Sequence, residues 1–453
     1  MLTAPRDLIR ARRAAAAKVV HAILTVVVAA HVGWLALHDG FSAVGMLLTI
    51  AALLSLAFVP RVPILALSVF AIAAYGMPRY EGPIMGLLRV NLLNWLALLA
   101  LTGWVAWLLR SGTRPPLRHR LILAMAALLG WGGLSLTLAW HGGASLDYEP
   151  KHHPEQWLQA SVLMLVAATV LDGRHRGWLF ALLLCAIPLA RYGVQAPGTL
   201  YLDGDVSTLS AMLIPFALVG AGTQRHKVLR LAFALAAVGL LWLVFSAQSR
   251  GAAIGLLAGL AALALGARWN RRAALLAMLL VALALALAPR HLFERFSVLW
   301  NPQASHARAG LDRATVDHRL QLWGGALRMV AERPWFGVGP GNYPARVGAL
   351  VPGSEGYVAH NSMLQAAAEA GVIGAALFLM IFGGALVALR SAAMRRNNAV
   401  DPSLALALQS SLAVYLAAGL FISRHDMQLA YLLVGWAVAL DVASRRATAS
   451  AAA

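Results

Sequence analysis

The chain has 453 residues, of which 60% are hydrophobic and 12% are charged, and its formal net charge is +19. Soluble domains are roughly 45–50% apolar and about 25% charged. The composition therefore excludes a string of soluble domains and predicts one helical membrane domain. The single cysteine, Cys185, excludes an intramolecular disulfide and a cysteine-ligated metal cluster.

The first 18 residues are basic and precede an apolar run at 19–37. This run is longer than the roughly 7–15-residue apolar core of a signal peptide, and no small-residue cleavage site follows it. We therefore interpret it as the first membrane helix.

A membrane helix needs about 20 predominantly apolar residues, and fourteen stretches approach this length. Several of them are short for a full crossing, so we predict 12 to 14 transmembrane helices. The candidate spans are 19–38, 41–59, 62–77, 85–109, 121–140, 157–171, 177–190, 206–222, 230–247, 251–266, 273–288, 361–389, 404–422 and 427–443.

The distribution of charge predicts the orientation. If the N-terminus is cytoplasmic, 23 of the 37 Lys and Arg residues fall in inner segments and six fall in short outer loops, as the positive-inside rule requires. The inner segments then carry the whole net charge of +19. Both termini are predicted to be cytoplasmic, and the basic excess indicates anionic lipid rather than nucleic acid.

The predicted fold is therefore an all-α polytopic membrane protein with a large helical outer loop between late helices. Its predicted parts are an N-terminal transmembrane bundle (1–288), the outer loop (289–360), C-terminal transmembrane helices (361–443) and a disordered cytoplasmic tail (444–453).

Within the outer loop, residues 316–331 have the apolar spacing of an amphipathic helix. The stripe consists of Val316, Leu320, Trp323, Leu327 and Val330. Such a helix can lie in the membrane interface, with Arg319 at the edge of the stripe and His318 on the far side. Arg319 then lies at the level of a lipid headgroup, where it either binds phosphate or extends to water without a ligand.

A glycine-rich segment, ERPWFGVGPGNYP, follows this helix. The alternating Gly337, Gly339 and Gly341 superficially resemble a nucleotide-binding loop. The dinucleotide pattern requires a preceding strand and GxGxxG spacing, and neither is present. We interpret the segment as a tight turn after Pro334.

His360 and Asn361 come directly before the next membrane helix. Asn361 or Ser362 suits the N-cap position. The partial positive charge of a helix N-terminus favours the neutral imidazole that a general base needs, and it attracts phosphate. His360 is therefore a candidate general base, and the alternative is a surface histidine in a loop.

Three arginines lie at the outer ends of apolar spans: Arg191, Arg250 and Arg424. Tyr192 directly follows the first of them. A charge close to the hydrocarbon region is costly unless it faces protein or water. The planar guanidinium pairs bidentately with phosphate oxygens, so these arginines are candidate phosphate ligands. A lipid headgroup contact is the alternative for each.

Another outer loop, HGGASLDYEPKHHPEQW, is rich in potential metal ligands. Its spacing matches no helix-borne zinc motif, so we interpret it as a solvated loop and predict no metal site. The residues concerned are His141, Asp147, Glu149, His152, His153 and Glu155.

Taken in order, these elements resemble the O-antigen ligase and Wzy-type polymerase superfamily of bacterial inner-membrane enzymes. The resemblance extends from about Arg191 to Gly374. It depends on the SRG turn at Ser249–Gly251, the large outer loop with its DHRLQLW and PWFGVGPGNYP elements, and the helix start HNSMLQAAAEAGVIG.

The resemblance implies a glycosyltransferase of the broad GT-C type, usually with about twelve spans, at the periplasmic face of the inner membrane. The implied donor is undecaprenyl-pyrophosphate-linked O-antigen, the acceptor is a hydroxyl of lipid A–core, and no cofactor or metal takes part. His360 is the implied catalytic base. The implied pyrophosphate ligands are Arg191, Arg250 and Arg319, with Tyr192, Asn361, Arg424 and His318 in possible supporting roles.

Two alternatives stay open. A Wzy-type polymerase uses the same donor and transfers to another lipid-linked repeat unit, and no residue here separates it from a ligase. A lipid-linked glycan transporter or flippase belongs to another class, whose members often show paired repeats and broken helices at mid-membrane. Here the unusual charges cluster at the outer surface instead. Only Glu369, about two turns into its helix, breaks the pattern of nearly uncharged mid-span regions.

Overall fold

The computed structural model describes residues 64–71, 92–141, 154–171, 174–193, 204–247, 249–266, 301, 309–395 and 399–452. All regular secondary structure in these ranges is helical, which confirms the predicted fold class. The chain divides into two compact units. One comprises Met1–Pro116 with Leu165–Leu171, and the other comprises Leu117–Met164 with Asp172–Ala453.

In the first unit, helices α3 (Ile64–Ala71) and α4 (Leu92–Ser111) pack against each other. They correspond to the predicted spans 62–77 and 85–109. The predicted spans 19–38, 41–59 and 273–288 lie outside the described residues.

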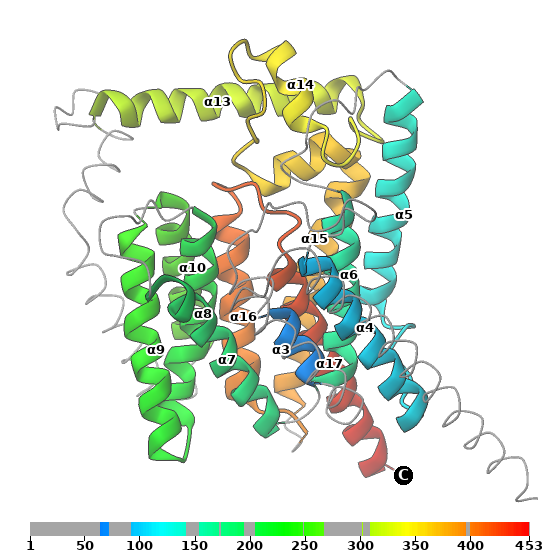
Figure 1. Cartoon of the computed structure of the whole chain (residues 1–453), viewed down its shortest axis with the longest axis vertical. Coiled ribbons are helices and arrows are strands. Elements are labelled where there is room, and N and C mark those ends of the chain that lie inside the picture. The colour runs from blue at the N-terminus through cyan, green and yellow to red at the C-terminus, as the bar shows by residue number, and fades with distance from the viewer. Residues whose placement is uncertain are drawn as a thin grey trace, which may run out of the picture. The chain divides into compact units, whose positions relative to one another are not determined.

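The second unit holds a bundle of helices that run roughly lengthwise in Figure 1. They are α5 (Arg120–His141), α6 (Pro154–Val170, whose end from Leu165 belongs to the first unit), α7 (Arg174–Gly193), α8 (Gly204–Thr223), α9 (Lys227–Ser246), α10 (Arg250–Gly266), α15 (Ser362–Met394), α16 (Pro402–Ala418) and α17 (Gln428–Ala452).

Four described stretches are long and apolar enough to cross a membrane by length and composition, as expected for a polytopic membrane protein. The predicted number of 12 to 14 spans stays a prediction. The four stretches are Arg120–Ala139, Val206–Thr223, Lys227–Ser246 and Ser362–Met394.

Small residues allow α10 and α16 to approach closely. A Cβ atom at Gly255 would lie 2.8 Å from the carbonyl oxygen of Val414, and one at Gly259 would lie 2.2 Å from a methyl carbon of the same valine. Glycines four residues apart on one helix face are typical of close helix pairs in membranes. This contact places the start of α10 beside the loop that follows α16.

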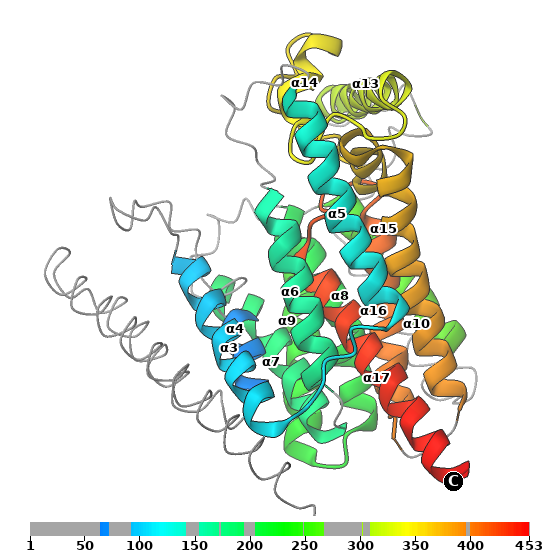
Figure 2. The same ribbon diagram turned by 90° about the vertical axis from the view of Figure 1, so that its right-hand side faces the viewer.

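Helices α13 (Ala309–Glu332) and α14 (Tyr343–Leu350) lie at one end of the bundle. In Figure 1, α13 runs across the ends of the long helices, and Figure 2 shows it almost end-on. Helix α13 corresponds to the helix predicted at 316–331, and it begins seven residues earlier than expected.

The apolar stripe predicted on α13 is divided between two environments. Val330 packs against a buried cluster that contains Leu322, Ala326 and Met329. In contrast, Leu320 and Leu327 are exposed. The cluster also contains Tyr343, Val347 and Val351, so α14 and the turn after it cover the buried side of α13.

The tail predicted to be disordered continues α17 as far as Ala452. The prediction of disorder at 444–453 was wrong for these residues because alanine has the highest helix propensity and because Arg445 is anchored. Its Nε lies 2.9 Å from a carboxylate oxygen of Asp441, one turn earlier.

Candidate functional site

The glycine-rich segment after α13 docks onto a break in α15. Helix α15 is interrupted at Gly371, where φ is 70° and ψ is −177°. Three backbone hydrogen bonds join the segment to this break: Val338 N to Ala368 O (2.9 Å), Gly339 N to Glu369 O (2.8 Å) and Val372 N to Pro334 O (2.8 Å). The carbonyl and amide groups that the break frees are thus paired with the docked segment.

Glycine is required on both sides of this junction. A Cβ atom at Gly371 would lie 2.1 Å from the carbonyl oxygen of Trp335, and one at Gly337 would lie 2.5 Å from that of Ala368. Both residues also have positive φ angles, which side chains disfavour. The segment is therefore a tight turn that packs backbone against backbone, in agreement with the sequence-based interpretation.

Helix α5 braces the same junction from its side, where it runs beside α15 (Figure 2). The indole Nε1 of Trp131 donates to Ala370 O at 2.9 Å, and the Trp131 ring stacks on Phe336 with centroids 4.6 Å apart. The Ser135 hydroxyl donates to Phe336 O and, at 3.1 Å, to Glu369 O. These contacts fix the first two turns of α15, and hence the position of the residues before it.

Asn361 is the N-cap of α15, as predicted. Its side-chain oxygen accepts hydrogen bonds from Met363 N and Leu364 N, both at 3.0 Å. His360, directly before the cap, has a φ of 51°. It is the one non-glycine residue with a left-handed backbone in the described parts of the chain. Such conformations are costly and cluster at functional sites.

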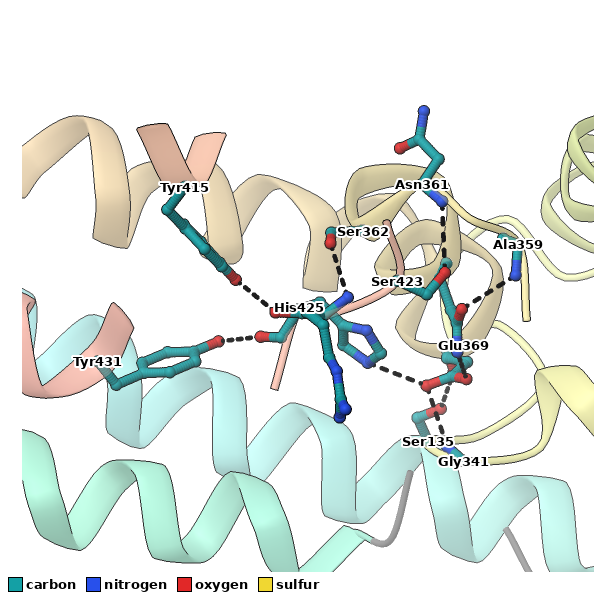
Figure 3. Close-up of polar contacts among 12 residues, drawn as sticks. Ser135, Gly341, Ala359, Asn361, Ser362, Glu369, Tyr415, Ser423, His425 and Tyr431 are labelled. Carbon is teal, nitrogen blue, oxygen red and sulfur yellow. Dashed lines mark hydrogen bonds and ion pairs between the residues drawn. The ribbon is translucent and has the colours of Figure 1, made fainter. Parts of the chain in front are cut away.

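The loop between α16 and α17 is bound to this helix start (Figure 3). Ser362 N donates to Gly419 O at 2.7 Å, and the Ser362 hydroxyl donates to Ile422 O at 2.7 Å. The same hydroxyl accepts from Arg424 N at 2.8 Å, and Asn361 N donates to the Ser423 hydroxyl at 3.3 Å. The structure therefore binds the backbone of Arg424 to Ser362, two residues after His360.

Two buried tyrosines hold the other side of this loop. The Tyr415 hydroxyl donates to Arg424 O at 2.8 Å, and the Tyr431 hydroxyl donates to His425 O at 2.8 Å. Figure 3 shows both tyrosines reaching the loop from α16 and α17. The backbone of Arg424 is thus bound at both its amide and its carbonyl group.

A buried ion pair lies beneath the loop. His425 Nε2 is 3.2 Å from Glu369 Oε2, and the two side chains are 1% and 0% exposed. Burial lowers the pKa of His425, but the hydrogen bond and charge of Glu369 and the charge of Asp426 raise it above its ordinary value. The sequence signalled Glu369 as a rare charge within a span, whereas His425 was not singled out, although it directly follows Arg424.

Arg250 is the first residue of α10 and is buried. Its neighbour Gly251 faces the α16–α17 loop, because a Cβ atom there would lie 3.0 Å from Phe421 Cβ and 3.5 Å from a methyl carbon of Ile422. The loop that carries Arg424 is therefore flanked by His360 on one side and by the Arg250 turn on another.

Arg191 and Tyr192 belong to the last turn of α7, and their side chains lie outside the described part of the structure. Two residues earlier, Leu189 packs against a buried cluster of Val206 and Leu243, and Ala247 packs against the same cluster. Ala247 caps α9, three residues before Arg250. The backbone of Arg191 is thus at the same end of the bundle as Arg250.

The residues predicted on α13 have two different settings. His318 contacts the turn after α14, with Nε2 2.8 Å from the Ser354 hydroxyl and its ring edge-on to Tyr357. Arg319 is half-buried and lies one turn before Leu322. Leu322 belongs to the same buried cluster as Ala359, the residue before His360.

The predicted absence of a metal site was tested only in part. Most of the histidine-rich loop between α5 and α6 lies outside the described residues. Within the described ranges, no group of three or more His, Cys, Asp or Glu side chains could hold a metal ion.

Residues 235–379 match the family model Wzy_C, described as O-antigen ligase. The matched segment contains Arg250, Arg319, His360 and Glu369, whereas Arg191 precedes it and the α16–α17 loop follows it. The comparison with curated proteins gives no match. The family match confirms the resemblance found in the sequence.

Proposed function

We propose that this chain, a member of the O-antigen ligase superfamily through residues 235–379, transfers O-antigen from undecaprenyl pyrophosphate to a hydroxyl of lipid A–core. The observation that carries the proposal is the junction at the start of α15. There a strained histidine, His360, lies at a capped helix N-terminus beside a bound loop that holds Arg424.

The donor already carries a competent leaving group, so the enzyme must stabilise the charge that develops on pyrophosphate as the glycosidic bond breaks. Arginines suit this role because they form bidentate, charge-assisted hydrogen bonds to phosphate oxygens. We assign it to Arg191, Arg250 and Arg319, with Arg424 in support. The N-terminus of α15 adds partial positive charge on the same side.

The acceptor hydroxyl must lose a proton as it attacks the anomeric carbon. In this proposal His360 takes that proton, while the bond between the anomeric carbon and the pyrophosphate oxygen breaks and its electron pair leaves with pyrophosphate. General-base catalysis of this kind contributes about 10²–10⁴-fold. A single displacement inverts the configuration at the anomeric carbon. The arginines supply the charge neutralisation, so the proposed reaction has no metal-dependent step.

The proposed setting is the bacterial inner membrane, with the His360 end facing the periplasm. The C-terminal ends of α15 and α17, which lie away from His360, support this orientation. There Asp441 pairs with Arg395 at 2.7 Å and with Arg445 at 2.9 Å. Basic residues gather at cytoplasmic ends of membrane helices.

The test is glycan transfer by the purified full chain in detergent, with lipid-linked O-antigen as donor, lipid A–core as acceptor and a chelator present. Glycan on lipid A–core is the expected product. Longer lipid-linked chains with lipid A–core unmodified would instead establish a polymerase. Absence of transfer to either acceptor, in an assay where a known ligase is active, would contradict the proposal and favour the transporter hypothesis.

A further inference from the structure

The ion pair between Glu369 and His425 is more extensively bonded than a single contact. Glu369 Oε2 also accepts from Gly341 N at 3.0 Å, and Oε1 accepts from Gln365 Nε2 at 2.9 Å. The Gln365 side chain in turn accepts from Ala359 N at 3.1 Å. The His425 ring packs edge-on against Trp157 of α6, with centroids 5.6 Å apart. Both carboxylate oxygens therefore have donors.

This carboxylate connects two branches of the candidate site. On one side it pairs with His425. The residue before His425 is Arg424, whose backbone is bound to Ser362 and Tyr415. On the other side it accepts a hydrogen bond from Gln365, whose side chain accepts from the amide of Ala359, the residue before His360. Figure 3 shows Glu369 between these branches. One buried charge thus sets the backbone on both sides of the site.

Stability alone is a weak explanation for such a pair. Removing two charges from water costs several kcal/mol each, and well-packed apolar residues often stabilise a protein as well or better than a buried pair. What a bonded pair adds is a fixed geometry. A displacement of about 1 Å in a reacting group can lower a rate by about 10²-fold, so a fixed geometry has direct catalytic value.

We propose that Glu369 and His425, with Gln365, form a positioning device that fixes Arg424 and His360 relative to each other. The inference rests on the proposed function, since it assigns those two residues to one reaction. Glu369 and His425 themselves are positioning residues, because their bonds run to the protein and not to the reacting groups.

The chain contains a matched control at the other end of the bundle. Asp441 is also 0% exposed and also pairs with a histidine, the partly buried His119, at 3.2 Å. Its other partners are Arg395 and Arg445. None of these residues belongs to the candidate site. Loss of the Asp441 charge therefore measures what a buried carboxylate and its ion pairs contribute to stability away from the candidate site.

The test compares Glu369→Gln, His425→Gln and the double variant with Asp441→Asn, using the full chain in detergent. Three quantities are measured for each: the melting temperature, kcat and KM for transfer from the lipid-linked donor, and the affinity for undecaprenyl pyrophosphate alone.

We expect each single variant at Glu369 or His425 to lower kcat/KM by about 10- to 100-fold. The double variant should lose little more than the worse single variant, since coupled residues are non-additive. Undecaprenyl pyrophosphate should bind more weakly because Arg424 moves. Asp441→Asn should lower the melting temperature and leave kcat/KM within about twofold.

Equal effects of Asp441→Asn and Glu369→Gln on kcat/KM would reduce the pair to a structural role and overturn the inference. Normal transfer by folded Glu369→Gln would do the same and leave the proposed function intact. If the wild-type chain transfers no glycan, the proposed function fails on its own. The affinity measurement then decides, and undecaprenyl pyrophosphate binding that is absent or is unchanged by Glu369→Gln overturns the inference too.

Discussion

At the scale of single residues, His360 joins a strained backbone to a chemically useful side chain. Its φ of 51° would suit glycine or asparagine better. A residue held in such a conformation needs surrounding contacts to keep it there, and the Asn361 cap and the Ser423 hydroxyl lie directly beside it. The strain is therefore supported by the same contacts that order the site.

Replacing His360 by asparagine separates the side chain from the backbone. Asparagine tolerates the left-handed region, so His360→Asn should keep the melting temperature of the wild type. Because the proposed general base is lost, kcat should fall by about 10²–10⁴-fold. The measurement is glycan transfer together with thermal unfolding in detergent. Transfer within a few-fold of wild type would exclude His360 as the base.

At the scale of an element, α15 works as two pieces joined at Gly371. The outer piece, up to Ala370, carries the cap and Glu369, and the inner piece continues through the bundle. The docked glycine-rich segment replaces the hydrogen bonds that the break removes. The site is thus built on a short, fixed helical segment.

Gly371→Ala tests this junction. A Cβ atom would collide with the Trp335 carbonyl and would strain a positive φ, at a cost of at least about 2 kcal/mol. We expect a lower melting temperature and reduced transfer. Gly383→Ala in the same helix is the control, because a Cβ atom there has no neighbour within 4 Å. Equal melting temperatures for the two variants would show that the break imposes no such requirement.

The loop between α16 and α17 should have a pH-dependent stability. The charged groups around the His425 ring are Glu369 from α15, and Arg424 and Asp426 from the loop itself. Because the pKa of His425 is raised above its ordinary value of 6.5 in the folded protein, its stabilising effect is complete below that value and is lost as pH rises through the raised pKa.

The difference in melting temperature between wild type and His425→Gln should therefore be larger near about pH 6 than near about pH 9. Thermal unfolding of both proteins in detergent across this range measures it. The His119→Gln variant controls for the loss of a histidine that pairs with a buried carboxylate far from the loop. A difference that stays constant or grows with pH would contradict a charged His425 in the folded state.

Local patterns in the sequence predicted local features well. The cap at Asn361 and the tight turn at Gly337 depend on residues that are close in sequence, and both are present. The pairing of Glu369 with His425 joins residues 56 positions apart through a fold that spacing alone does not define. The same applies to the docking of Trp335 on Gly371, since no local sequence pattern in either segment predicts that the two are in contact.

At the scale of the whole molecule, the proposed topology places the two ends of the bundle in different compartments. The chain has one cysteine, Cys185, which is buried, so introduced cysteines report position without interference. Pro352 lies in an exposed turn at the His360 end, and Ala449 lies in the exposed last turns of α17. Each can be replaced by cysteine.

A membrane-impermeant maleimide added to intact spheroplasts should label Pro352→Cys and spare Ala449→Cys. Lysis should make both reactive, which controls for accessibility of the thiols themselves. Labelling of Ala449→Cys before lysis would place the C-terminus outside and would contradict the positive-inside interpretation.

The α16–α17 loop is synthesised after most of the residues that it binds. Contacts that complete the junction join residues 131 and 135 of α5 to residues 336 and 369–370, and the last partners to emerge are His425 and Tyr431. Domains are generally built from the N-terminus as the chain is made. A nascent chain therefore carries Arg250 and His360 into the membrane well before the loop that binds them together. Under the proposed function, assembly of α16 and α17 is thus the step that completes the site, and a chain that ends before α16 should be inserted but should not transfer glycan.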